Sequence, residues 1–339
     1  MHTVSAVGGN AAKVNQTASY FLALLAAALA TAAAVPFWRH WCRRYGAVDD
    51  PGHRKIHATS IPLAGGLAVI TGVLAALLGG TIFAFLHSSS GTMGLFQYGL
   101  GRRAIQLLGI TAGAFGMLLV GLRDDKVELQ PAVKFGGQLL AALAVAATGV
   151  RITLFVHNII FSYAITALWI LTVVNAFNFM DNMNGLCAGL GAIGAAWFGL
   201  VAAHAAVPQY LVATMAFLIA GALLGFLPYN FPKASAFLGD SGSHLVGYLL
   251  AILGILPHFY TPKHQRMLAV LTPLLILAVP LGDLAWVVLL RWRMGKPFYL
   301  GDTNHLSHRL VRRGLSATQA VLIIWLLAAA LGALAFLWQ

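Results

Sequence analysis

Acidic side chains are rare in this chain, and one adjacent pair of them ends a long apolar run. The sequence has nine Asp and Glu residues among 339, against 21 Lys and Arg. Asp124 and Asp125 are adjacent in the stretch GLRDDKVELQP, which ends a long apolar run. A single Asp at a helix end is commonly a cap, but a charge at the centre of a bilayer costs on the order of 3 kcal/mol. A pair at the edge of an apolar run therefore indicates chemistry rather than capping.

Four further polar segments hold residues that could act with this pair. In chain order they are DDPGHRKIHATSIPLAGG, NAFNFMDNMNGL, YNFPKASAFLGDSGSH and GDTNHLSHRL. Their candidate residues, beside Asp124 and Asp125, are Lys55, His57, Asn178, Asp181, Asn184, Asp240, His305, His308 and Arg309. Oxygen ligands suit Mg²⁺, whereas Lys, Arg and protonated His neutralise phosphoryl oxygens. The five segments together predict a site for a metal ion and a diphosphate.

Some of these residues allow another interpretation. His305 and His308 could share a face and bind zinc, but neither a thiolate nor a third histidine is near, and Arg309 would repel a cation. Phosphate contact is therefore favoured for this motif. The asparagines around Asn178 could instead join packed helices. Asp283 lies within a predicted span, about two helical turns from Arg291, and stays open between a functional acid and a structural ion pair.

The composition predicts that these segments are carried by membrane-spanning helices. The chain is 60% hydrophobic and 9% charged, with a mean hydropathy of +0.82, whereas soluble domains are about 25% charged. We expect an all-α integral membrane protein forming one domain over residues 1–339, with about ten spans. They run near 18–38, 63–86, 104–122, 134–150, 159–178, 186–206, 209–228, 244–257, 267–290 and 317–338.

Charge patterning predicts the orientation of these spans. Fifteen of the 21 Lys and Arg residues fall in the loops after the odd-numbered spans, although Arg102 and Arg103 oppose the trend. The positive-inside rule places those loops in the cytoplasm. The acidic loop residues all lie on the same side, so the cytoplasmic face should carry the active site. Basic residues spread over short loops favour membrane lipids and anionic substrates over nucleic acid, despite a net charge of +12.

Several classes of site are excluded by the motifs. The sequence has no Gly-x-x-x-x-Gly-Lys-Ser/Thr phosphate loop and no Asp-Gly-x-x-Ala-Arg run of the CDP-alcohol phosphatidyltransferases. Its two cysteines, Cys42 and Cys187, are too few for a disulfide framework.

Taken in order, the five segments resemble those of the polyprenyl-phosphate N-acetylhexosamine-1-phosphate transferases, glycosyltransferase family 4. The resemblance covers 49–314, and the RKIH and FNFMDN stretches look closer to the GlcNAc-1-phosphate branch than to the muramoyl-pentapeptide branch. It implies transfer of a sugar 1-phosphate from a UDP-N-acetylhexosamine to undecaprenyl phosphate with release of UMP, as the first membrane step of a cell-surface polysaccharide such as O-antigen in lipopolysaccharide or cell-wall polymer. It also implies Mg²⁺, with Mn²⁺ as an alternative, in a multi-pass protein of the bacterial inner membrane; a homodimer is one assembly that the sequence allows.

The resemblance also implies roles for individual residues. One of the two adjacent carboxylates, by one proposal Asp124, deprotonates or positions the lipid phosphate, while Asp240 and Asp125 are expected metal ligands. Asp181 would lie near the nucleoside and metal, and the histidine motif would contact the diphosphate. Basic residues that approach the phosphates would be Lys55 and Lys134, and the residues that hold and stack the uracil would be Asn230 and Phe237.

Two positions depart from the family pattern. Asn184 stands where many members have the second acid of DGxDG, so a second acidic function is unavailable there. Ser307 replaces one histidine of the HxHHR motif. Two other hypotheses therefore stay open beside the transferase: a transporter of an anionic solute, and a catalytically inactive relative. A transporter should place charges near the bilayer midplane, whereas nearly all charges here fall near one face.

Overall fold

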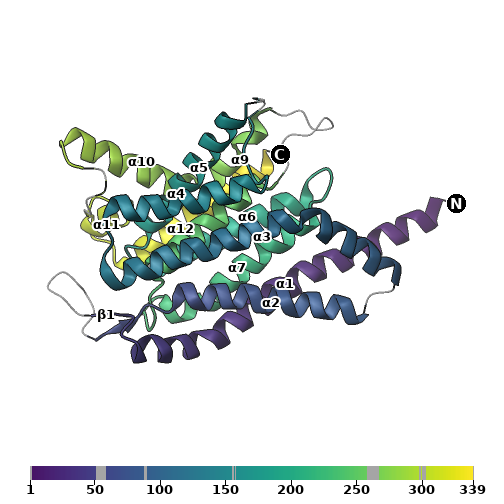
Figure 1. Ribbon diagram of the computed structural model, residues 1–339, viewed down its shortest axis with the longest axis horizontal. Coiled ribbons are helices and arrows are strands. Elements are labelled where there is room, and N and C mark those ends of the chain that lie inside the picture. The colour runs from purple at the N-terminus through teal and green to yellow at the C-terminus, as the bar shows by residue number, and fades with distance from the viewer. Residues whose placement is uncertain are drawn as a thin grey trace.

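The computed structural model describes residues 2–50, 59–87, 90–154, 156, 158–257, 267–297, 299 and 303–338. This part of the chain is mostly helical (Figure 1). The α-helices are α1 (His2–Arg44), α2 (Gly65–His87), α3 (Ser90–Val127), α4 (Pro131–Ala147), α5 (Ile159–Met180), α6 (Leu186–His204), α7 (Tyr210–Asn230), α8 (Gly239–Ile255), α9 (Thr272–Ile276), α10 (Ala278–Arg293), α11 (Leu306–Arg312) and α12 (Ala317–Leu337). A 3₁₀ turn, Met267–Leu271, precedes α9, and the strands β1 (Val48–Asp49) and β2 (Ile61–Pro62) form one antiparallel ribbon.

Helix boundaries follow local sequence signals. The Asn158 side chain accepts the N–H of Phe161 at 3.0 Å and caps α5. α12 begins with a capping box in which Ser316 and Gln319 bond each other's backbone. Pro131 starts α4, where the missing N–H of proline costs nothing.

The expected membrane protein of the all-α class is confirmed. Seven helices are long and apolar enough to span a bilayer, or eight if the bent pair α9–α10 counts as one, within the described residues. A helix lies at each predicted span, but α4 and α8 have 17 residues each and are short for a full crossing. The count of about ten spans therefore stays a prediction.

The ninth predicted span is not a continuous helix. Residues 269–276 and 278–293 meet at an angle of 71°. Pro280 lacks the N–H that would bond the carbonyl of Ile276, and its ring would clash with that carbonyl. The chain breaks at Leu277, whose backbone has φ −99° and ψ 16°.

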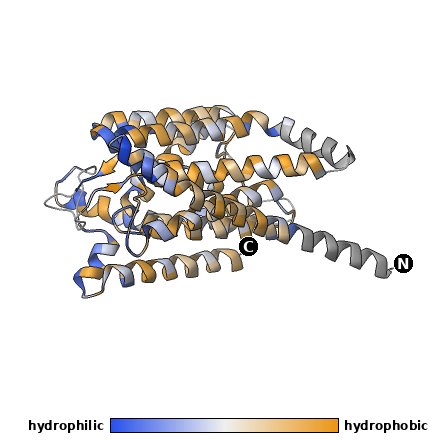
Figure 2. Cartoon of the chain, turned by 90° about the horizontal axis from the view of Figure 1, so that it is seen from below, coloured by the Kyte–Doolittle hydropathy of each residue, from blue (hydrophilic) through white to orange (hydrophobic). Residues whose placement is uncertain are grey.

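α8 lies at the centre of the bundle and holds the site in place. Nearly all of its residues are buried, among them Ser241, Ser243 and His244. It packs against α2, α3, α5 and α6. Hydrophilic residues gather at the end of the bundle that carries the ribbon (Figure 2). α8 begins at this end, so its first turn faces the polar segments.

Candidate active site

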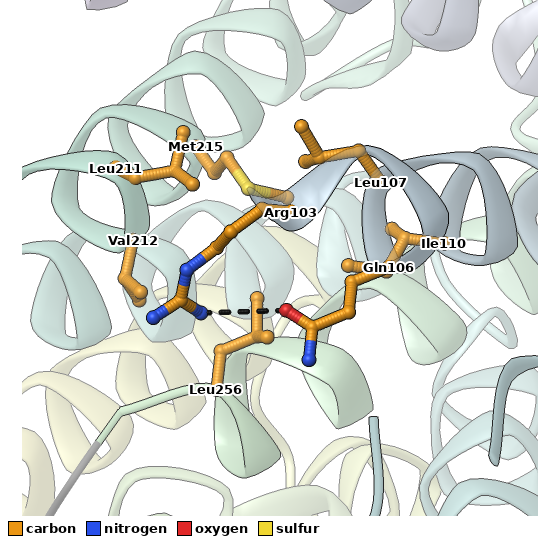
Figure 3. Close-up of a pocket in the computed structure, with 8 residues that line it drawn as sticks. All are labelled: Arg103, Gln106, Leu107, Ile110, Leu211, Val212, Met215 and Leu256. Carbon is orange, nitrogen blue, oxygen red and sulfur yellow. Dashed lines mark hydrogen bonds between the residues drawn. The ribbon is translucent and has the colours of Figure 1, made fainter. Parts of the chain in front are cut away.

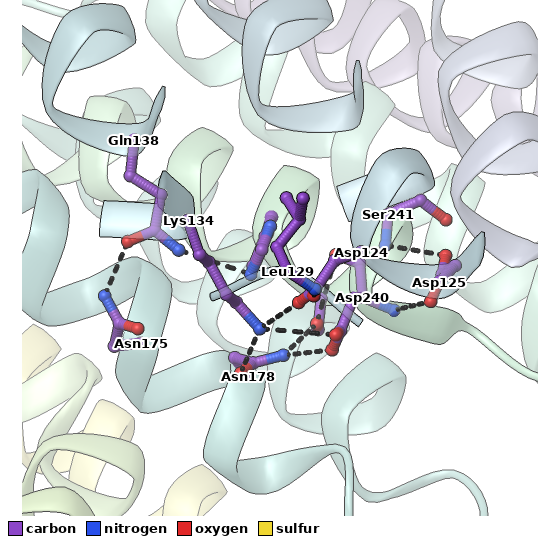
Figure 4. Close-up of polar contacts among 11 residues, drawn as sticks. Asp124, Asp125, Leu129, Lys134, Gln138, Asn175, Asn178, Asp240 and Ser241 are labelled. Atoms are coloured by element: carbon purple, nitrogen blue, oxygen red, sulfur yellow. Dashed lines mark hydrogen bonds and ion pairs between the residues drawn. The ribbon is translucent and has the colours of Figure 1, made fainter. Parts of the chain in front are cut away.

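Lys134 joins the ends of three helices. Its Nζ lies 2.6 Å from Asp124 Oδ2, at the end of α3, and 3.2 Å from Asp240 Oδ2, in the first turn of α8. It also donates to Asn178 Oδ1 at 3.3 Å, near the end of α5 (Figure 4). The Asp124 side chain is 7% exposed and the Asp240 side chain 33% exposed, so the cluster is open on the side of Asp240.

Asn178 fixes the other oxygen of Asp240. Its Nδ2 donates to Asp240 Oδ1 at 2.5 Å and to Ser243 Oγ at 3.0 Å. The amide thus accepts from Lys134 and donates to Asp240, which orders all three groups. Ammonium, amide and carboxylates within one cluster form a site that can exchange protein ion pairs for bonds to phosphate or metal.

Asp125 is used differently from its neighbour. Oδ1 accepts the backbone N–H of Asp240 at 2.7 Å, and Oδ2 accepts that of Ser241 at 3.1 Å (Figure 4). It therefore satisfies two of the four N–H groups that the first turn of α8 leaves unpaired. In this structure Asp124, not Asp125, faces the Lys134 ammonium. The predicted role of Asp125 as a metal ligand stays a prediction.

Glycines allow the helices to approach at this point. A Cβ at Gly121 of α3 would lie 2.4 Å from the carbonyl oxygen of Asp240, and one at Gly66 would lie 2.7 Å from Gly242 N. Gly239 has φ +72°, a conformation that an L side chain rarely adopts, and a Cβ there would meet Asp125 Oδ2 at 2.9 Å. The backbone of α8 therefore touches α2 and α3 directly.

Asp181 follows α5 and is partly buried. Burial, together with the charges of Asp240 and Asp125, raises the pKa of this carboxyl well above its ordinary value, although a backbone hydrogen bond from Gly239 opposes the shift. The expectation that Asp181 lies near a metal stays a prediction. Because Asp181 repels two neighbouring carboxylates, a bound cation would relieve that repulsion.

The turn after Asp181 is held by amides. Asn184 donates to the carbonyl of Pro232 at 3.2 Å, a bond that a carboxylate in this position could not make. Asn230 is 3% exposed; its Oδ1 accepts Gly185 N–H at 2.7 Å and its Nδ2 donates to Ala236 O at 3.0 Å. The structure thus assigns both amides a part in loop packing, and the predicted substrate contacts stay predictions.

Phe237 is positioned by backbone pairing with the segment that opens α2. Its N–H donates to Pro62 O at 2.9 Å, and its carbonyl accepts Gly65 N–H at 3.0 Å. The uracil-stacking role is untested. Lys55 and His57, the remaining predicted substrate contacts, lie outside the described residues.

The histidine motif is anchored to α10 and to the Asp181 turn. His305 Nδ1 lies 2.7 Å from Asp283 Oδ2, and the ring stands edge-on to Phe179 at 5.5 Å between centroids. Ser307 Oγ donates to Asn182 Oδ1 at 2.7 Å. The ring centroids of His305 and His308 are 6.3 Å apart, and Arg309 stacks over Trp286 at 4.7 Å. The motif therefore packs against both flanks of Asp181.

The sequence of this chain is similar to those of known proteins. The sequence pattern of glycosyl transferase family 4 matches residues 107–258. A probable undecaprenyl-phosphate N-acetylglucosaminyl 1-phosphate transferase of Bacillus subtilis is 32% identical over 292 residues, covering 84% of this chain and 75% of that protein. The chain belongs to glycosyl transferase family 4.

Two other relatives of this family 4 member have similar names. A decaprenyl-phosphate N-acetylglucosaminephosphotransferase of Mycobacterium tuberculosis is 35% identical over 328 residues, covering 89% of this chain and 78% of that protein. An undecaprenyl-phosphate alpha-N-acetylglucosaminyl 1-phosphate transferase of Escherichia coli is 26% identical over 314 residues, covering 89% and 79%. Asp124, Lys134, Asn178 and Asp240 all fall inside the matched region 107–258.

A polar residue that lies next to the Lys134 cluster was missed in the sequence analysis. Gln138 lies one helical turn after Lys134 on α4, and its Oε1 accepts a hydrogen bond from Asn175 Nδ2 at 2.8 Å. Its own Nε2 lies 3.3 Å from His244 Nε2, so a second polar layer joins the same helices α4, α5 and α8. The regular spacing from Lys134 to Gln138 and from Asp240 to His244 was the available signal.

A pocket elsewhere in the protein is separate from this site. It lies between α3, α7 and α8 and includes Arg103, Gln106 and Leu256 (Figure 3). Arg103 and Asp124 are 21 residues apart on one helix, which corresponds to about 31 Å. None of the candidate site residues lines this pocket.

Proposed function

We propose that the chain transfers N-acetylglucosamine 1-phosphate from UDP-N-acetylglucosamine to a polyprenyl phosphate and releases UMP. The observation that carries this proposal is the Lys134 cluster, where one ammonium joins Asp124, Asp240 and Asn178. The names of the family 4 relatives supply the substrate class.

The chemistry suits this cluster. An oxygen of the lipid phosphate attacks the β-phosphorus of the UDP-sugar, and the bond from that phosphorus to the bridging oxygen breaks. UMP leaves with the bridging oxygen, and the new diphosphate stays on the lipid. Phosphoryl transfer depends mainly on positioning and on charge neutralisation. Lys134 can exchange its carboxylate partners for phosphoryl oxygens and so neutralise the developing charge.

Asp124 is the carboxylate placed to act on the nucleophile. It faces the Lys134 ammonium, and its other oxygen is held by the Leu129 N–H at 2.7 Å. A phosphomonoester has its second pKa at about 6, so much of the lipid phosphate is already deprotonated at neutral pH. Asp124 therefore contributes more by positioning the nucleophile than by removing a proton.

The donor set fits Mg²⁺. No group of three or more His, Cys, Asp and Glu side chains forms a closed metal site among the described residues. Mg²⁺ does not need one, because it binds through one or two carboxylates, waters and substrate phosphates. Asp240 is the more exposed carboxylate and would hold the ion with Asp124 or Asp125. When bound, Mg²⁺ would neutralise the negative charge that the diphosphate carries on its oxygens.

We also propose that the chain lies in a bacterial inner membrane and that the polar end of the bundle faces the cytoplasm. The excess of basic residues in the loops at this end supports that orientation. Lys126 is exposed there, and both native cysteines are buried. A Lys126→Cys variant in intact cells should react with an impermeant maleimide only after the membrane is opened. Reaction in intact cells would show that the polar end faces the outside and would contradict the proposed orientation.

A direct assay tests the proposed activity. Purified protein is incubated with UDP-N-acetylglucosamine, undecaprenyl phosphate and Mg²⁺, and UMP is measured. UMP should accumulate only when both substrates and the divalent cation are present. Substrate-dependent uptake into proteoliposomes without UMP would favour a transporter, and absence of both activities in folded protein would favour an inactive relative.

A further inference from the structure

A carboxylate outside the Lys134 cluster holds one edge of the candidate site. Asp283 lies on α10 and is 6% exposed as a residue, and the side chain of its partner His305 is 7% exposed. Oδ2 lies 2.7 Å from His305 Nδ1, and Oδ1 accepts the backbone N–H of Leu306 at 2.6 Å. Both oxygens of one buried carboxylate therefore bind the start of α11. We propose that Asp283 is a positioning residue that fixes the orientation and tautomer of His305, and this inference rests on the proposed function.

The tautomer follows from donor and acceptor rules. A carboxylate only accepts hydrogen bonds, so His305 Nδ1 must carry a proton to bond Asp283. Nε2 is then the nitrogen through which the ring acts on a phosphate, whether as acceptor or, in the doubly protonated ring, as donor. In many enzymes a carboxylate accepts a hydrogen bond from one histidine ring nitrogen and so leaves the other nitrogen free to contact the substrate or a metal.

The ring is fixed by packing as well. It stands edge-on to Phe179, the residue after Asn178 of the Lys134 cluster. The guanidinium of Arg291 lies over the same phenyl ring, with its Cζ 4.9 Å from the centroid. Asp283, Phe179 and the backbone of α11 therefore leave the His305 ring little rotational freedom.

The same helix has a second attachment that does not use Asp283. Ser307 Oγ donates to Asn182 Oδ1 at 2.7 Å and ties α11 to the turn after Asp181. Ser307→Ala is accordingly the matched control: it loosens α11 without touching the Asp283–His305 bond.

A double-mutant cycle on turnover tests the proposal. Asp283→Asn should lower kcat on the order of 10- to 100-fold with little change in KM, as loss of an orienting partner does. In a His305→Ala background the same change should have almost no further effect, because the ring it orients is absent. Ser307→Ala should lower activity by the same factor in both backgrounds. Equal effects of Asp283→Asn with and without His305 would overturn the proposal.

A spectroscopic measurement keeps the test independent of activity and of variant folding. The ¹⁵N shifts of the His305 ring, assigned by their loss in His305→Asn protein, should show a protonated Nδ1 in the unmodified protein. An unprotonated Nδ1 would overturn the inference even if the enzyme is active. A protonated Nδ1 in a protein that releases no UMP would support the positioning role while the proposed function fails.

Discussion

Asp125 accepts the backbone N–H of Asp240, with 2.7 Å between nitrogen and Oδ1. Two residues 115 apart in the sequence are thus joined by a hydrogen bond from a backbone N–H to a side-chain oxygen. The two adjacent acids therefore have different roles. Asp125 caps the helix that carries Asp240, whereas Asp124 faces Lys134. The stretch GLRDDKVELQP contains one carboxylate turned to the site and one turned to the fold.

Asp125→Ala should destabilise the protein. It removes both acceptors of the first turn of α8, and the loss of buried bonds to a charged group costs about 1–3 kcal/mol. The thermal unfolding midpoint in detergent should fall by several degrees. Asp50→Asn is the control, because Asp50 is an exposed acid bonded to Ser60 and surface changes usually stay within about 0.5 kcal/mol. Equal midpoints for Asp125→Ala and unmodified protein would contradict the capping role.

Gly121→Ala should impair both stability and activity. The added methyl would lie 2.4 Å from the carbonyl oxygen of Asp240, so α3 and α8 must separate and the bonds of Asp125 must lengthen. Gly136→Ala on α4 is a matched control, since a Cβ there meets nothing within 4 Å. It should be neutral or stabilise the helix by up to about 1 kcal/mol. The two variants can be compared by unfolding midpoint and UMP release; similar behaviour would refute the packing argument.

Lys134→Gln should lower kcat/KM by about 100-fold or more. The ammonium both neutralises phosphate and bonds the Asp124 and Asp240 carboxylates, so its loss leaves them to repel each other and misplaces both. Lys126→Gln changes an exposed lysine on the same end of the bundle and should leave kcat/KM within about twofold. Steady-state UMP release measures both variants. A near-normal kcat/KM of the Lys134→Gln variant would show that Lys134 does not take part in catalysis.

Asp181 should make stability depend on pH. Its pKa is raised, so the folded state binds the proton more tightly than the unfolded state. Its contribution to stability is present at low pH and is lost as pH rises through the folded pKa. With divalent ions chelated, Asp181→Asn should therefore raise the unfolding midpoint more at pH 8 than at pH 5, relative to unmodified protein. An equal or opposite difference would show that the carboxylate is not strained by its neighbours.

The sequence predicted the membrane class, the helix positions and the polar segments because apolar length and charge placement are local properties. It could not predict how Asp125 differs from Asp124, since that depends on α8 meeting α3 at Gly121. The break at Leu277 was also missed, although Pro280 was its signal. Asp283 was left open between two roles, and only the fold brings it to His305.

The fate of the β-phosphorus tests the central claim most directly. The protein is incubated with Mg²⁺, undecaprenyl phosphate and UDP-N-acetylglucosamine labelled with ³²P at the β position, and lipid and water phases are separated. We expect the label to enter the lipid phase as sugar 1-phosphate and unlabelled UMP to appear in water. Asp240→Asn should abolish both at any Mg²⁺ concentration. Label retained in UDP while sugar enters the lipid, or labelling of lipid by Asp240→Asn at the normal rate, would contradict the proposed reaction.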